Sequence, residues 1–211
     1  MKLIGMLDSP YVRRVAVSLQ LLGLPFEHLS LSVFRGFAQF EQINPVVKAP
    51  TLVCDDGTVL MDSTLILEYA EALARPRSLM PADLNALRHE LHVIGLALAA
   101  TEKSVQIYYE QALRPQDKQH RPWLDRVTGQ MRAAYAMLEH ELARRPLPAT
   151  RETIGQAAAT SAIAWQFTQH VVPHAVPPAD HPHLAALSAA AEALPEFEAA
   201  PHGDSTFVAA G

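Results

Sequence analysis

Residues 2–30 read KLIGMLDSPYVRRVAVSLQLLGLPFEHLS, and this stretch decides the fold. KLIGML is short and apolar and stops at Asp-Ser-Pro, as a buried strand does. Apolar residues then recur at helical spacing from Val12 to Leu22, and Gly23 stands where a C′ glycine ends a helix. FEHLSLS alternates like a second strand. Strand, helix and strand in this order predict a parallel pair of strands joined by a crossover helix.

The following residues complete a small mixed domain. Residues 33–42 are polar and rich in aromatic side chains, which indicates a loop and a short helix. TLVC and TVLM flank Asp55-Asp56-Gly57, a strong signal for a β-hairpin. A further helix is predicted from Ser63, a good N-cap candidate. The order of elements is therefore βαβ, helix, ββ, α.

From about Pro81 onward the pattern is helical only. Helices are predicted over residues 82–113, 122–144, 153–171 and 183–194, with prolines between them. We expect an α/β plus all-α fold. A thioredoxin-like N-terminal domain (βαβ–ββα) covers residues 1–75, residues 76–82 form a linker, and residues 83–211 form an all-helical C-terminal domain.

The composition excludes several classes of protein. With 211 residues, 49% of them apolar and 18% charged, the chain can bury a sizeable core and is not disordered. A net charge of −5 argues against nucleic acid as a partner, because phosphate binding needs a basic face. The single cysteine, Cys54, excludes an intrachain disulfide and is expected to be buried and inert. With no secretory signal and no membrane-length apolar stretch, we expect a cytoplasmic protein that does not contact a membrane.

Three places in the first domain could hold a ligand. Pro50 directly precedes the third predicted strand, where a cis bond would turn the Ala49 backbone toward a peptide-like ligand. Asp62 and Ser63 lie at the start of a helix whose free N–H groups attract a carboxylate, and Asp62 can accept from an ammonium. Ser9 stands in the same relation to the first helix. Each of these caps, taken alone, is also an ordinary helix N-cap.

Arg13 and Arg14 lie in the first turns of the first predicted helix. The positive end of the helix dipole gives arginine no stabilisation there. We therefore expect a negative group close to these side chains, with a solvated face as the alternative.

These motifs, taken together, resemble the glutathione S-transferase family in its serine-type bacterial form. The resemblance runs through SPYVRR at 9–14, NPVVKAPTL at 44–52 and DSTLILEY at 62–69, and the helical remainder agrees with it. It implies a glutathione-binding thioredoxin-like domain and a helical domain with a pocket for a small apolar electrophile. It also implies a homodimer, in which Phe34 and Phe37 are expected to dock into the partner subunit.

The resemblance also implies roles for individual residues. Ser9 matches the serine whose hydroxyl donates to the glutathione sulfur and stabilises the thiolate, which is the nucleophile. Ala49, followed by Pro50, matches the residue whose backbone pairs with the cysteinyl part. Asp62 and Ser63 match the pair that takes the γ-glutamyl ammonium and carboxylate. The family more often carries Glu before this Ser, so the shorter Asp62 makes its contact directly or through water.

Further assignments follow from the same resemblance. Lys48 matches a residue near the glycyl carboxylate, and Arg35 is expected to assist from the preceding loop. Tyr11 and Tyr108 are candidates for the co-substrate pocket. The family's capping box in the helical domain corresponds here to residues 153–156, where Gln156 is expected to reach back to the cap amide.

The sequence thus predicts an enzyme of detoxification type, which conjugates glutathione to small electrophiles or reduces peroxides. No metal is expected, because the histidines between His170 and His183 have no carboxylate or cysteine to complete a ligand set. Two alternatives stay open: a transferase-like scaffold that binds a protein partner, and a carrier of apolar ligands. The chain keeps the residues that hold glutathione, which favours the enzyme.

Overall fold

The computed structural model describes residues 1–207, which divide into two compact units. The first unit comprises Met1–Leu79 together with the chain from Ala193 onward, and the second comprises Met80–Glu192. The predicted domain of residues 83–211 differs from this division at its end. The residues after Glu192 pack with the first unit because buried Arg13 binds carbonyl oxygens there, a contact that no local sequence pattern reveals.

The first unit is built on a four-stranded mixed sheet. Its strands are β1 (Lys2–Ile4), β2 (Glu27–Leu29), β3 (Thr51–Val53) and β4 (Val59–Met61), in the order β2-β1-β3-β4. β1 is parallel to β2 and antiparallel to β3, while β3 and β4 form a hairpin. The predicted thioredoxin-like βαβ–ββα order is confirmed.

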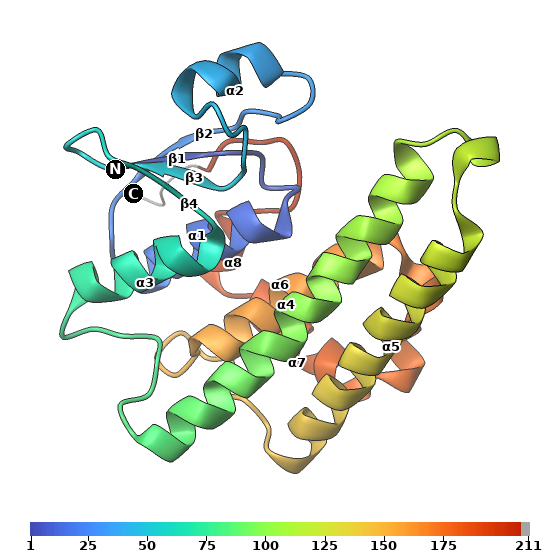
Figure 1. Ribbon diagram of the computed structural model, residues 1–211. Helices are drawn as coiled ribbons and strands as arrows, with labels where there is room; N and C mark the ends of the chain where they lie inside the picture. The colour runs from blue at the N-terminus through green and yellow to red at the C-terminus, as the bar shows by residue number, and fades with distance from the viewer. Residues whose placement is uncertain (208–211) are drawn as a thin grey trace. The chain divides into compact units, whose positions relative to one another are not determined.

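Helices cover both faces of this sheet (Figure 1). α2 (Phe37–Ile43) lies on one face, over a core of Ile4, Leu31 and Phe40. α1 (Pro10–Leu21) and α3 (Ser63–Ala74) lie on the other face. The short α8 (Pro195–Glu198) packs against α1 on this side. α1 ends as predicted, with Gly23 at a φ of 73° after the cap residue Leu22.

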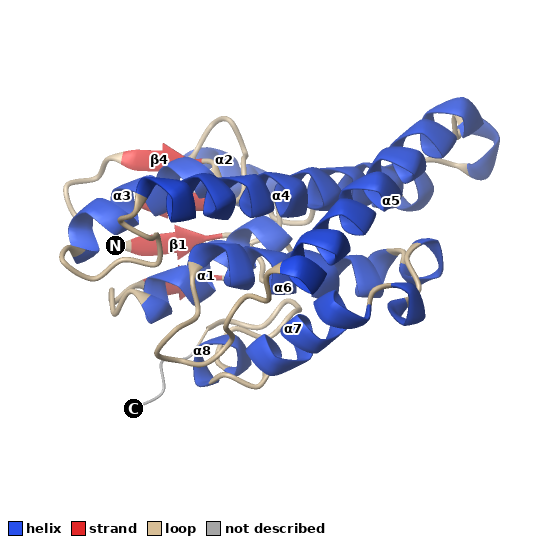
Figure 2. Cartoon of the chain, turned by 90° about the horizontal axis from the view of Figure 1, so that it is seen from below, coloured by secondary structure: helices blue, strands red, loops and turns tan. Residues whose placement is uncertain are grey.

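In the second unit the described residues form helices and the loops between them. The strands drawn in Figure 2 all lie in the first unit. The long helices α4 (Leu84–Ala112) and α5 (Arg121–Arg144) pack against one another. The alanine-rich α6 (Gln156–Val171) is buried along most of its length and packs against α4 and α7 (Pro182–Glu192). Short 3-10 turns occupy Gln116–Lys118, Pro173–Ala175 and Pro178–Asp180.

Three local predictions were wrong. α6 begins at Gln156 with Gly155 as its N-cap, and no side chain of the predicted capping box caps it. Instead, Glu90 of α4 accepts from the Ala157 N–H at 2.6 Å, because a carboxylate from another helix reaches the free amide. The N-cap of α3 is Asp62 and not Ser63, since the Asp62 carboxylate accepts from the Thr64 N–H. Cys54 is only half-buried, at the start of the hairpin turn.

Candidate functional site

Ser9 lies where the chain leaves β1 and enters α1. Pro10 at the first helical position fixes the entry angle without leaving an amide unpaired. The Ser9 hydroxyl oxygen accepts from the Val12 N–H at 3.4 Å, which is a long and therefore weak capping bond. Within residues 1–207 this half-buried hydroxyl donates its own hydrogen to no protein group. Ser9 can therefore donate a hydrogen bond to a bound group.

The loop before β3 presents the Ala49 backbone. The Ala49–Pro50 peptide is cis, a bond that the sequence left open, and Val47 has a φ of 51°. Two hydrogen bonds fix the conformation of this loop. The Thr51 hydroxyl donates to the Lys48 carbonyl at 2.6 Å, and the side chain of buried Asn44 donates to the Thr51 hydroxyl at 2.8 Å. Among the described residues, the Ala49 N–H and C=O have no hydrogen-bond partner outside the sheet ladder. They remain available to an extended, peptide-like ligand.

The start of α3 combines a strained backbone with hydrogen-bonding groups. Asp62 has a φ of 73° and a ψ of 125°, a conformation that costs a non-glycine residue free energy and that occurs most often at functional sites. One Asp62 oxygen accepts from the Thr64 N–H at 2.9 Å. The buried Ser63 hydroxyl accepts from the Arg14 guanidinium at 3.1 Å, which leaves the Ser63 hydrogen free to be donated.

Three contacts bring these segments together. Arg14 of α1 donates to the hydroxyls of Ser63 and Thr64, both at 3.1 Å, and so joins the helix that follows Ser9 to the start of α3. The Lys48 ammonium lies 4.0 Å from an Asp62 oxygen, which joins the loop to α3. A Cβ added to Gly5 would lie 2.6 Å from Val12 and 3.1 Å from Ala49, so only glycine lets β1, α1 and the loop approach this closely.

The electrostatics of this end of the unit favour an anion. Burial lowers the pKa of Arg14 to about 10, while nearby Asp62 and Tyr11 raise it, so Arg14 stays charged at neutral pH. Its charge adds to the positive end of the α3 dipole. Arg13 serves a different purpose: its guanidinium donates to the Ala200 carbonyl at 2.7 Å and lies over the Phe197 ring. Both arginines are buried, so the solvated face is excluded: Arg13 donates to neutral carbonyl oxygens and Arg14 to neutral hydroxyls, with the negative Asp62 near Arg14.

The remaining predicted site residues are Arg35, Tyr11 and Tyr108. Arg35 is largely exposed, with its guanidinium 3.9 Å from an Asp204 oxygen and in contact with the Met6 sulfur. Tyr11 is half-buried on α1, and Tyr108 is exposed on α4 in the other unit. The sequence did not predict that Arg14 links two of the ligand loops. The only available signal was its unexplained place at a helix start.

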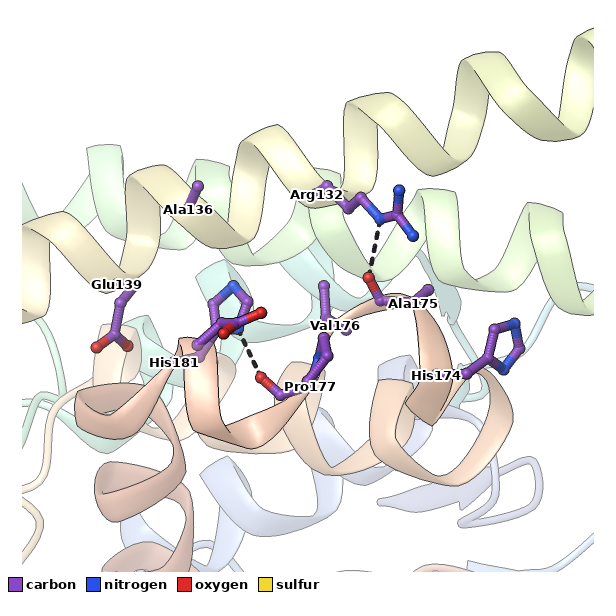
Figure 3. Close-up of a pocket in the computed structure, with 9 residues that line it drawn as sticks. Arg132, Ala136, Glu139, His174, Ala175, Val176, Pro177 and His181 are labelled. Atoms are coloured by element: carbon purple, nitrogen blue, oxygen red, sulfur yellow. Dashed lines mark hydrogen bonds between the residues drawn. The ribbon is translucent and has the colours of Figure 1, made fainter.

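The helical unit has a cleft of its own, of about 510 Å³, between α5 and the turns before α7 (Figure 3). Arg132 donates to the Ala175 carbonyl and His181 donates to the Pro177 carbonyl, as the dashed lines show. None of the residues predicted to bind glutathione line it. In the part of the chain that the structure describes, no three His, Cys, Asp or Glu side chains are placed to hold a metal ion. No described helix is both long enough and apolar enough to cross a membrane.

Comparisons with protein-family models, curated sequences and solved structures all indicate the same protein family. The family model for the glutathione S-transferase N-terminal domain matches residues 3–78. An uncharacterized GST-like protein of Escherichia coli K12, YibF, is 29% identical over 188 residues, which cover 89% of this chain and 91% of that protein.

Two similar solved structures come from Pseudomonas fluorescens Pf-5 and belong to a glutathione transferase family member. The one with bound S-(propanoic acid)-glutathione is 32% identical, with 95% and 98% of the two chains covered and a TM-score of 0.78. The one with bound glutathione is 31% identical, with 94% and 97% covered and a TM-score of 0.79.

Proposed function

Because this chain belongs to the glutathione transferase family, we propose that its thioredoxin-like unit binds glutathione and that Ser9 activates the glutathione thiol. The observation that carries the proposal is the convergence of three loops, at Ser9, Ala49 and Asp62-Ser63. Each loop has polar groups whose hydrogen-bonding capacity is not used up by residues 1–207. The solved relatives with bound glutathione and a glutathione conjugate support this choice of ligand.

The chemistry of glutathione matches these groups one by one. Its γ-glutamyl carboxylate suits the α3 start, where the Ser63 hydroxyl and the helix amides donate and Arg14 adds charge. Its γ-glutamyl ammonium suits the Asp62 carboxylate. The cysteinyl backbone pairs with the Ala49 N–H and C=O, as a strand pairs with a free edge. Lys48 is the candidate for the glycyl carboxylate, although its present partner is Asp62.

In the proposed reaction, Ser9 acts on the sulfur. A free thiol has a pKa of about 8.5, so most of it is protonated at neutral pH. A hydrogen bond from the Ser9 hydroxyl, together with the dipole of α1, stabilises the thiolate and lowers that pKa. The thiolate then attacks an electrophilic carbon and forms a C–S bond, while the leaving group departs with the electron pair.

The co-substrate and the assembly belong to the same proposal. We expect a small apolar electrophile or a peroxide, with Tyr11 and Tyr108 as pocket residues. We also expect a homodimer, with the exposed rings of Phe34 and Phe37 at the partner's surface. Measuring the molecular mass in solution for the native chain and for Phe34→Ser with Phe37→Ser tests the dimer, because the double variant should dissociate.

A combined binding and turnover experiment tests the function. The chain is passed over immobilised glutathione and then assayed with a chlorinated nitroaromatic and with an organic peroxide. We expect retention and turnover of at least one of these substrates. Retention without turnover would indicate a carrier, and failure to bind would indicate a scaffold for a protein partner. Either of these results would overturn the proposed enzyme.

A further inference from the structure

The end of the chain returns to the thioredoxin-like unit as a strap, which we define as residues 200–207. At its start, the Ala200 carbonyl accepts from buried Arg13 at 2.7 Å. In its middle, the Asp204 carbonyl accepts from the Ser30 hydroxyl at 2.7 Å. At its end, the Phe207 ring stacks on Phe26 with centroids 4.6 Å apart. The strap thus follows the β2 edge of the sheet.

His28 of β2 makes the contact that depends on protonation. One ring nitrogen, Nε2, lies 2.7 Å from the Gly5 carbonyl oxygen, and the other, Nδ1, accepts from the Phe207 N–H at 2.9 Å. A carbonyl oxygen can only accept and a backbone amide can only donate. Both bonds exist together only in the neutral imidazole that carries its hydrogen on Nε2. A proton on Nδ1 would face the Phe207 N–H directly.

We propose that the strap is a pH-released element, held down by neutral His28 and freed at its Phe207 end when His28 takes a second proton. The release would move Asp204, which pairs with Arg35 at 3.9 Å. Asp204 also acts electrostatically on Asp8, the residue before Ser9, so release removes a negative charge beside the candidate site. The proposal itself concerns the strap alone and does not require that glutathione binds.

The surroundings of His28 give the direction of the effect. Burial lowers the pKa of His28, and its bond to the Gly5 carbonyl raises it by less. A histidine with a lowered pKa in the folded chain supports the folded contact above that pKa and loses it as the pH falls. The strap is therefore attached at neutral pH and is released below the ordinary histidine pKa of about 6.5.

Other charged or titratable groups lie near His28, and their contributions to the pH dependence must be separated from that of His28. Lys2 on β1 and Glu27 on β2 pair with each other at 3.2 Å and, by strand alternation, project from the opposite face of the sheet. The strap itself carries His202 and Asp204, and Asp8 lies on the loop after β1. Of these groups, His202 is the other imidazole.

Hydrogen exchange of the C-terminal peptide that contains Phe207 tests the proposal, with rates corrected for the intrinsic effect of pH. In the native chain we expect protection at pH 7.5 to fall by about tenfold or more at pH 5. His28→Gln keeps a donor for the Gly5 carbonyl but has no acceptor for Phe207, so protection should be low at both pH values. His28→Asn places an oxygen near the Nδ1 position, so protection should be high at both.

Controls separate this mechanism from its alternatives. Asp204→Asn and His202→Gln should keep the pH step, and circular dichroism confirms that each variant is folded. Protection that does not change with pH in the native chain would overturn the proposal. So would a pH step that persists in His28→Asn or disappears in His202→Gln. Because no glutathione is present, failure of the proposed function would leave these outcomes unchanged.

Discussion

Three helices of the helical unit begin in a different way from α1 and α3 of the thioredoxin-like unit. In the thioredoxin-like unit, α1 and α3 are capped by the residue just before each helix, Ser9 and Asp62. In the helical unit, α4 is capped in the same local way by Asp83, but α5, α6 and α7 each begin against a glutamate from an earlier helix. Glu110 accepts from the His120 N–H at the start of α5, and Glu90 accepts from the Ala157 N–H at the start of α6. Glu139 accepts from the His183 and Leu184 N–H groups at the start of α7, and all four distances are 2.6–2.9 Å.

The two kinds of helix start suit different purposes, ligand binding in one unit and helix packing in the other. A helix start has four amides without helical partners, and a local cap satisfies one of them and leaves the end open. A carboxylate supplied by another helix also accepts from the free amides, and in addition it links the two helices. We propose that the starts of α1 and α3 keep amides for a ligand anion. The glutamates at the starts of α5, α6 and α7 hold the helices of their own unit together.

The largest effect is expected from Ser9→Ala, which removes the donor at the open end of α1. The bond to sulfur strengthens as negative charge develops, so kcat/KM should fall by about 100-fold, the usual loss for one such donor. Glutathione affinity should change little. Steady-state kinetics with calorimetry measures both quantities, and a loss confined to affinity would contradict the role of Ser9.

The next effect is expected from Arg14→Met, which removes the link between α1 and α3. Hydrogen bonds from a charged group contribute about 1.5–3 kcal/mol, so the Kd for glutathione should rise by about tenfold or more. Arg13→Met is the matched control, because Arg13 donates to Ala200 of the strap, whereas Arg14 donates to Ser63. Equal losses of affinity in the two variants would show that Arg14 has no specific role.

A smaller effect, on stability alone, is expected from Glu90→Ala in the helical unit. Loss of a helix cap costs about 1 kcal/mol, whereas Glu90→Gln keeps an accepting oxygen. Both tryptophans, Trp123 and Trp165, lie in this unit, so their fluorescence during urea unfolding reports its stability. Unchanged glutathione affinity in Glu90→Ala would confirm the contrast between the two units, and a marked loss would break it.

The stability of the native chain and that of Glu90→Gln should depend differently on pH. Burial raises the pKa of Glu90 above its ordinary value of 4.5, and the Ala157 N–H, His89 and Arg145 lower it by less. The protonated form is therefore favoured by folding, and this stability is lost as the pH rises through the folded pKa. The free energy of unfolding of the native chain should fall relative to Glu90→Gln as the pH rises from 4 to 7. A parallel pH dependence would contradict this.

The smallest effect is expected from Arg35→Ala. The Arg35 side chain and its partner Asp204 are both 76% exposed, and ion pairs of this kind contribute little in water. We expect the Kd for glutathione to change by less than about twofold. A tenfold increase of this Kd, measured by calorimetric titration, would show that Arg35 contributes to glutathione binding as much as Arg14 does.

The sequence predicted what local patterns encode. The period of apolar residues gave the strands and helices, Gly23 gave the end of α1, and Pro50 gave the start of β3. The missed tertiary contacts join residues far apart in the chain. Glu90 caps a helix 67 residues later, and Arg13 binds Ala200 across 187 residues. Such partners depend on tertiary packing, for which neither periodicity nor cap preference carries information.

The central claim is that three separated loops of one unit bind glutathione. Calorimetric titration of glutathione into the native chain, up to millimolar concentration, tests it most directly. We predict a saturable heat with one site per chain, weakened by Arg14→Met and nearly unchanged by Ser9→Ala. Absence of saturable heat, or the same heat in Arg14→Met as in the native chain, would contradict the account.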